Sequence, residues 1–110
     1  MKLFKCSVCN LIIEGEHAPD KCPKCGMPAE KFNELTPEQA KKIYDADETN
    51  TLLATLIETA DELIKVCHRG LEIKLDPGCV GVFEKAKDAL WLMKQLAKAE
   101  IETHVKRDKW

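Results

Sequence analysis

The chain lacks three features that would assign it at once to a broad class of protein. No apolar run approaches the ~20 residues that a membrane-spanning helix needs, and the formal net charge is only -2 over 110 residues. Its basic residues are spread along the sequence, with no internal repeat or low-complexity tract. Neither nucleic acid nor an anionic membrane is therefore an expected partner. A chain of this length forms one domain or two small ones.

Cysteine is present in a specific pattern. Cys6 and Cys9 form one CxxC pair, Cys22 and Cys25 form a second, and twelve residues separate the pairs. Two such loops can aim four sulfur atoms at one point, and thiolates in a tetrahedral arrangement select zinc or a single iron. Gly26 follows the second pair and allows a tight turn there. Two disulfides or four unrelated thiols are the alternative, but the spacing favours a metal site.

The same cysteines bear on location. The sequence from Met1 to Cys6 reaches the first candidate ligand at once, which leaves no room for a signal peptide. Thiolate ligands persist in a reducing compartment. We therefore expect a cytoplasmic protein.

The sequence pattern changes near Thr36, which predicts a metal-binding domain over residues 1–35 and a helical domain over 36–110. In the first domain, residues 3–5 and 11–13 are expected strands, and the small apolar core is expected to consist of Phe4, Leu11 and Phe32. So short a segment would draw most of its folding free energy from the metal, about 10–16 kcal/mol for structural zinc in finger peptides.

Three helices are predicted in the second domain. Thr36 is the expected N-cap of a helix that begins at Pro37 and ends near Ala46, with Gln39 completing a capping box. A second helix starts between residues 45 and 51 and ends near Gly70, and a third covers 76–107. Apolar residues recur at helical spacing in the two long helices: Leu53, Leu56, Ile57, Ala60, Leu63, Ile64 and Cys67, then Val80, Phe83, Ala86, Leu90, Met93, Ala97 and Ile101.

A short loop over residues 71–75 would join the two long helices into an antiparallel hairpin. The last helix also carries apolar residues beside its main stripe, namely Val82, Ala89, Leu92 and Leu96. Two helices cannot cover so broad an apolar surface, so we expect a homodimer or higher homo-oligomer that completes a four-helix bundle. In the alternative, the short first helix and the metal module cover the surface within a monomer.

The N-terminal third resembles the rubredoxin-like domain that ends rubrerythrins. The resemblance covers residues 3–35 and rests on the segment 4–9 (FKCSVC), on Glu14-Gly15 and Ala18-Pro19, on the segment 22–26 (CPKCG), and on Phe32. Asn10 replaces a glycine usual after the first pair, but asparagine tolerates the left-handed conformation. Rubrerythrins carry a di-iron bundle before this domain, whereas here a helical segment follows it.

The resemblance implies one iron, cycling between Fe³⁺ and Fe²⁺, held by the four paired cysteines. By analogy with rubredoxins, Cys9 and Cys25 would be the outward ligands, beside a surface of Val8, Leu11 and Met27. The expected function is electron transfer to a redox partner protein, with the helices serving for oligomerisation or docking. The alternative is a zinc-ribbon interaction module in which Zn²⁺ is purely structural.

A di-iron enzyme is a weaker interpretation, because such bundles need Glu-x-x-His pairs and the helical segment has none. Glu100 and His104 are separated by four positions, which is more typical of a solvated pair near a helix end. An electron carrier is therefore expected rather than a catalyst.

Two further thiols remain. Cys67 lies on the apolar stripe and Cys79 in the first turn of the last helix, where both suit buried structural thiols. A redox disulfide or a second metal site across the hairpin loop is the alternative. His17 is expected to be exposed.

Overall fold

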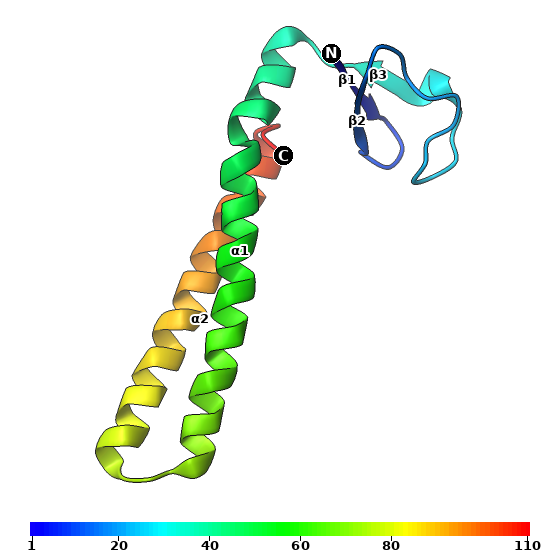
Figure 1. The fold of residues 1–110 in the computed structure, drawn as a ribbon. Coiled ribbons are helices and arrows are strands. Elements are labelled where there is room, and N and C mark those ends of the chain that lie inside the picture. Colours follow the sequence, from blue (N-terminus) through cyan, green and yellow to red (C-terminus); the bar gives the residue numbers. More distant parts are fainter. The chain divides into compact units, whose positions relative to one another are not determined.

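The computed structural model describes residues 1–110, which divide into two compact units, Met1–Asp45 and Ala46–Trp110. The first unit contains a three-stranded sheet and the start of the first helix; the second consists of helix (Figure 1). These units confirm the predicted fold class, a small β module with four clustered cysteines followed by an all-α hairpin. No helix has both the length and the apolar character needed to cross a membrane.

The sheet comprises β1 (Lys2–Cys6), β2 (Ile12–Gly15) and β3 (Phe32–Glu34), in the order β2-β1-β3. Both pairings with β1 are antiparallel. A 3₁₀ turn, η1 (Ala29–Lys31), leads into β3. The sequence predicted β1 and β2 but not β3, because three residues are too few to show an alternating pattern. Pairing with β1 defines this strand.

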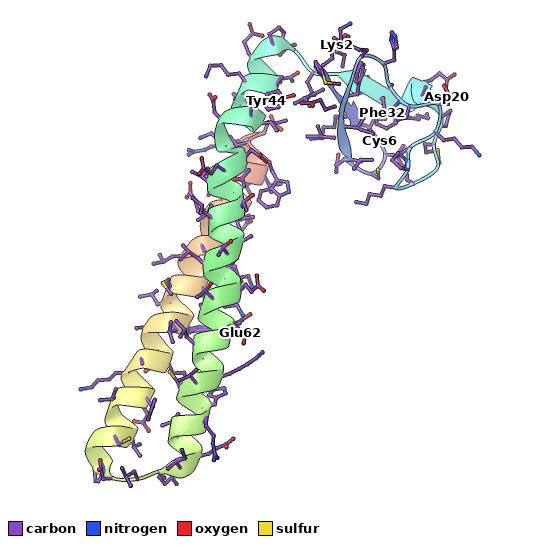
Figure 2. All side chains as sticks on the ribbon, in the orientation of Figure 1. Lys2, Cys6, Asp20, Phe32, Tyr44 and Glu62 are labelled. Atoms are coloured by element: carbon purple, nitrogen blue, oxygen red, sulfur yellow. The ribbon has the colours of Figure 1, made fainter.

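The core of the N-terminal unit is small and built around the cysteines. Phe4 and Phe32 are buried with Cys6 and Cys22, and Leu11 packs against them from a half-buried position. The predicted core is therefore confirmed. Phe32 lies opposite Cys6 in the β1–β3 register, and Figure 2 shows both side chains within the same module. Folding the sheet thus places the first cysteine against the aromatic core.

Helix α1 (Pro37–Ile73) begins as the sequence predicts. The Gln39 backbone N–H donates to Thr36 Oγ1 at 3.2 Å, and the Thr36 backbone N–H donates to Gln39 Oε1 at 2.8 Å. These two bonds form a capping box that satisfies donors at the helix start.

The predicted break near Ala46 is wrong, because α1 is one continuous helix of 37 residues. The acidic residues between 45 and 51 suit a helix start, but nothing there ends a helix. No glycine or proline occurs between Pro37 and Gly70, and Ala46 is buried. Acidic side chains remain compatible with the interior of a helix when they face solvent.

Helix α2 (Pro77–Lys106) matches the predicted 76–107 closely. Asp76 is its N-cap: the carboxylate accepts a hydrogen bond from the Cys79 backbone N–H at 2.7 Å. Residues 74–76 separate the helices, and Lys74 adopts a positive φ of 52° there. The connection is shorter than predicted, since α1 continues past Gly70 to Ile73.

Small residues make the closest contacts in the hairpin. The buried positions are Ala46, Ala60, Cys67, Gly70 and Ala97, and no large apolar side chain is buried in either helix. At Gly70, an added Cβ would lie 2.2 Å from Cε2 of Phe83, so the ring rests directly on the α1 backbone. The hairpin is therefore closely packed along its centre, but its larger apolar side chains stay partly in solvent.

Candidate metal centre

Two equivalent backbone loops carry the paired cysteines. In the first, the Asn10 N–H donates to the Cys6 carbonyl at 2.9 Å and the Cys6 N–H donates to the Leu11 carbonyl at 2.8 Å. In the second, Gly26 donates to Cys22 at 2.8 Å, and Cys22 donates to the Met27 carbonyl at 2.7 Å. The two CxxC segments thus fold into the same turn.

Each turn closes through a residue with positive φ. Asn10 has φ of 65° and Gly26 has φ of 76°. Glycine adopts this region without steric cost, and asparagine is among the few other residues that visit it routinely. The expectation that Asn10 preserves the turn is therefore confirmed.

The four sulfur atoms converge. The Sγ atoms of Cys6 and Cys25 are 3.7 Å apart, those of Cys9 and Cys22 are 3.6 Å apart, and all four lie within 4.8 Å of one another. A tetrahedron with metal–sulfur bonds of about 2.3 Å has edges of about 3.8 Å. The sulfur positions therefore fit a single tetrahedral ion, and none of these cysteines forms a disulfide.

Backbone N–H groups stabilise the inner thiolates. The N–H groups of Cys9 and Val8 lower the pKa of Cys6 despite its burial. For Cys22, burial raises the pKa, but the N–H groups of Cys25 and Lys24 outweigh it and the pKa falls to about 6. A thiolate that accepts such bonds is ready to ligate a cation.

Cys25 is shifted in the opposite direction. The Met27 N–H lowers its pKa, but burial and the neighbouring thiols of Cys22, Cys9 and Cys6 raise it to about 12. Like charges held close together cannot all ionise without a counter-charge. A bound cation supplies that charge, so this cluster of thiols is suited to a metal ion.

The two halves of the site differ in exposure. Cys6 and Cys22 are buried, whereas Cys9 and Cys25 are half-buried, which confirms the predicted outward pair. Of the residues expected beside them, Val8 and Met27 are exposed and Leu11 is half-buried.

The remaining candidate residues lie outside this cluster. His17 is exposed as predicted. Cys67 is buried and Cys79 half-buried, and both are free thiols. Glu100 and His104 do form the predicted pair, with 3.2 Å between Oε1 and Nε2.

His104 is not solvated, in contrast to the prediction. Its side chain is 11% exposed, because its Nδ1 contacts Oδ1 of Asn50 on α1. Asn50 in turn donates to the Lys109 carbonyl at 2.8 Å. This contact joins the two helices near the end of α2. An isolated asparagine gives no periodic signal, so the sequence did not indicate it.

Comparisons with known proteins define the class of this site. Residues 4–33 match the family model for the rubredoxin-like domain of rubrerythrin. A curated relative, reverse rubrerythrin-1 of Clostridium acetobutylicum, is 55% identical over 38 residues, which are 34% of this chain and 21% of the relative. No solved structure matches the chain. The N-terminal unit thus contains a rubredoxin-like domain of the rubrerythrin type, and the aligned segment spans about a fifth of that relative.

Metal binding at about pH 8 is expected to release protons, because thiols must ionise to become ligands. Cys25, with a pKa of about 12, is protonated at that pH, whereas Cys22, with a pKa of about 6, is already a thiolate. At about pH 5, Cys22 is also protonated, so binding weakens and more protons leave. Calorimetry in buffers of different ionisation enthalpy counts these protons. An equal count at both pH values would contradict the assignment.

Proposed function

We propose that the protein binds one iron ion through Cys6, Cys9, Cys22 and Cys25 and transfers single electrons. The observation that carries this proposal is the tetrahedral spacing of the four sulfurs, at 3.6 and 3.7 Å across two pairs. The rubrerythrin-type sequence match over residues 4–33 favours iron as the resident metal. When bound, iron in such a site supplies a one-electron Fe³⁺/Fe²⁺ couple.

The protein contributes to electron transfer by keeping the four sulfur atoms in a rigid arrangement. Each loop is fixed by two backbone hydrogen bonds, and the Ser7 N–H donates to the Lys31 carbonyl at 2.8 Å, which ties the first loop to η1. A rigid set of ligands limits reorganisation when the charge of the site changes. The N–H groups directed at Cys6 and Cys22 also offset negative charge, which raises the reduction potential of a thiolate site.

The outward edge of the site is suited to a protein partner. Cys9 and Cys25 lie at this edge with Val8 and Met27, which are 51% and 39% exposed. Lys24 adds a positive charge close by, since its Nζ lies 3.4 Å from the Cys9 carbonyl oxygen. An apolar surface beside the ligands provides a short path for electrons to a redox partner. We place the protein in a reducing compartment such as the cytoplasm, where thiolates persist.

Structural zinc is the second candidate. The same sulfur spacing fits Zn²⁺ with bonds of about 2.3 Å, and zinc readily occupies four-thiolate sites. In that case the metal would only build the fold, and the helical hairpin would carry the function as an interaction module.

A charge introduced beside the ligands tests the redox assignment. Val8→Glu adds a negative charge beside the ligands, which should lower the reduction potential by about 10–30 mV because the reduced state is the more negative. Voltammetry of the iron protein measures this shift.

Val8→Gln is the matched control, since it adds polarity without charge and should shift the potential by less. Both variants should keep one metal ion per chain. A protein that can be neither reduced nor reoxidised by one electron would overturn the proposal and leave structural zinc as the assignment.

A further inference from the structure

The helical unit has two different sides. Figure 1 shows α2 lying beside α1 from the connecting loop to the C-terminal end of α2. The direct contacts that fix their register are Asn50 with His104, Asp61 with Lys94, and Gly70 with Phe83. The two residue numbers in each pair add to between 153 and 155, so the helices run antiparallel without a register shift.

Large apolar side chains gather on one side of this hairpin. Seven of the eight lie one position before a residue of the inner stripe, the stripe that faces the other helix (Leu53, Ile57, Ala60, Ile64 and Cys67 on α1; Phe83, Ala86, Leu90, Met93, Ala97 and Ile101 on α2), as Leu52 precedes Leu53. The eighth, Ile73, lies seven positions after Val66 and so falls on the same side of α1. In an α-helix the preceding residue points about 100° away around the axis. Because the two helices are antiparallel, this rotation leads to the same side of the hairpin in both. Eight residues on this side are between 42% and 64% exposed: Leu52, Leu56, Leu63, Val66, Ile73, Val82, Leu92 and Leu96. We call them the apolar face.

The opposite side is charged. One position after the inner stripe, α1 carries Glu58, Asp61, Lys65 and His68, and α2 carries Glu84, Lys87, Lys94, Lys98 and Glu102, together with one exposed aromatic residue, Trp91. Solvent therefore suits that side, whereas the apolar face needs a partner. A contiguous apolar surface of this size is uncommon on a monomer.

The dimensions of the apolar face match those of a protein interface. It runs from Leu52 to Ile73, which is about 33 Å at 1.5 Å per residue, and two helices make it about 20 Å wide. Its footprint is thus on the order of 600 Å², so two such faces would bury about 1,200 Å², at the lower bound for specific interfaces.

Charge indicates which partner fits. On this side of the hairpin, between Thr49 and Thr103, the charged residues are Lys85 and Glu100, and both belong to α2. Along the sequence, both are equally far from the midpoint between Leu92 and Met93. The same point is the centre of the α2 residues on this side, which run from Val82 to Thr103. A twofold axis through this centre brings Lys85 of each copy to Glu100 of the other.

We propose that the apolar face binds a second copy of this chain, with the two hairpin loops at opposite ends of a four-helix bundle. In this arrangement α2 packs against α2 of the partner, the apolar residues cover one another, and two Lys85–Glu100 pairs form across the interface. With the loops at the same end, α2 would lie on the partner's α1, and both charges would face an uncharged stripe. The charge pattern therefore selects the opposite-end dimer.

Charge reversal tests this arrangement on the full metal-loaded chain. Lys85→Glu and Glu100→Lys should each raise the dimer dissociation constant about tenfold, because each places two like-charged pairs in the interface. The double variant should restore it to within about threefold of the original value. Sedimentation equilibrium measures these constants.

Matched controls lie on the charged side of α2. Lys98→Glu is the control for Lys85→Glu. Glu102→Lys is the control for Glu100→Lys, since each loses one contact along the helix, Glu102 with Lys106 at 3.0 Å and Glu100 with His104. Both controls should leave the dissociation constant within about twofold of its original value. Circular dichroism should show the same helix content in all four single variants.

Three results would overturn the proposal. A chain that stays monomeric at about 0.1 mM, a concentration well above the dissociation constant of an obligate dimer, would exclude a second copy as the partner. A dimer in which the double variant fails to recover would exclude the opposite-end arrangement. A monomer that associates only with a different protein would assign the apolar face to that protein.

Discussion

Cys6→Ala is expected to abolish stoichiometric metal binding and to unfold the N-terminal unit. Cys6 is fully buried, it ends β1, and its sulfur lies 3.7 Å from that of Cys25. Removing one of the four ligands loses most of the folding free energy that the metal supplies, which is about 10–16 kcal/mol in small structural sites. The apolar core around Phe4 and Phe32 is too small to compensate.

The helical unit should survive the same substitution. Far-UV circular dichroism should retain the helical signal, while amide exchange in residues 2–34 becomes fast. Cys67→Ala is the matched control, because it removes a buried sulfur from α1 instead. It should leave one metal ion bound per chain. Full metal content in Cys6→Ala would disprove the ligand assignment.

Phe32→Ala should weaken metal binding by roughly a hundredfold to a few thousandfold. The ring is buried opposite Cys6, and truncating a buried phenylalanine costs about 3–5 kcal/mol. Because metal binding and folding of this unit are coupled, the cost appears as lost affinity at about 1.4 kcal/mol per tenfold. Competition with a chromophoric chelator measures it.

Val8→Ala serves as the control for this substitution. Val8 is 51% exposed, so its truncation should change the affinity by about threefold or less. Equal affinities for Phe32→Ala and the unaltered protein would show that the metal loops fold without the sheet core.

Much of the metal centre could be predicted from the sequence, because its determinants are local. The spacing of the two CxxC pairs identifies the four thiols that the structure brings together. Asn10 and the capping box at Thr36 were also predictable, since each depends on a few adjacent residues. Local backbone rules suffice for such features.

Features that depend on distant residues were less accessible. The strand β3 exists because of its pairing with β1, and the burial of His104 depends on Asn50, 54 positions away. The break expected near Ala46 failed for another reason: acidic residues that favour a helix start do not by themselves end the preceding helix. The pKa of Cys22 falls because backbone N–H groups point at its sulfur, and the pKa of Cys25 rises because of burial and the neighbouring thiols; spacing reveals neither.

The most direct test of the central claim is anaerobic metal analysis combined with coulometric titration of protein purified from its native host. The proposed function predicts one iron per chain, bound by the four paired cysteines, and one electron taken up reversibly per iron. One zinc per chain with no electron uptake would contradict it and leave the N-terminal unit a structural module.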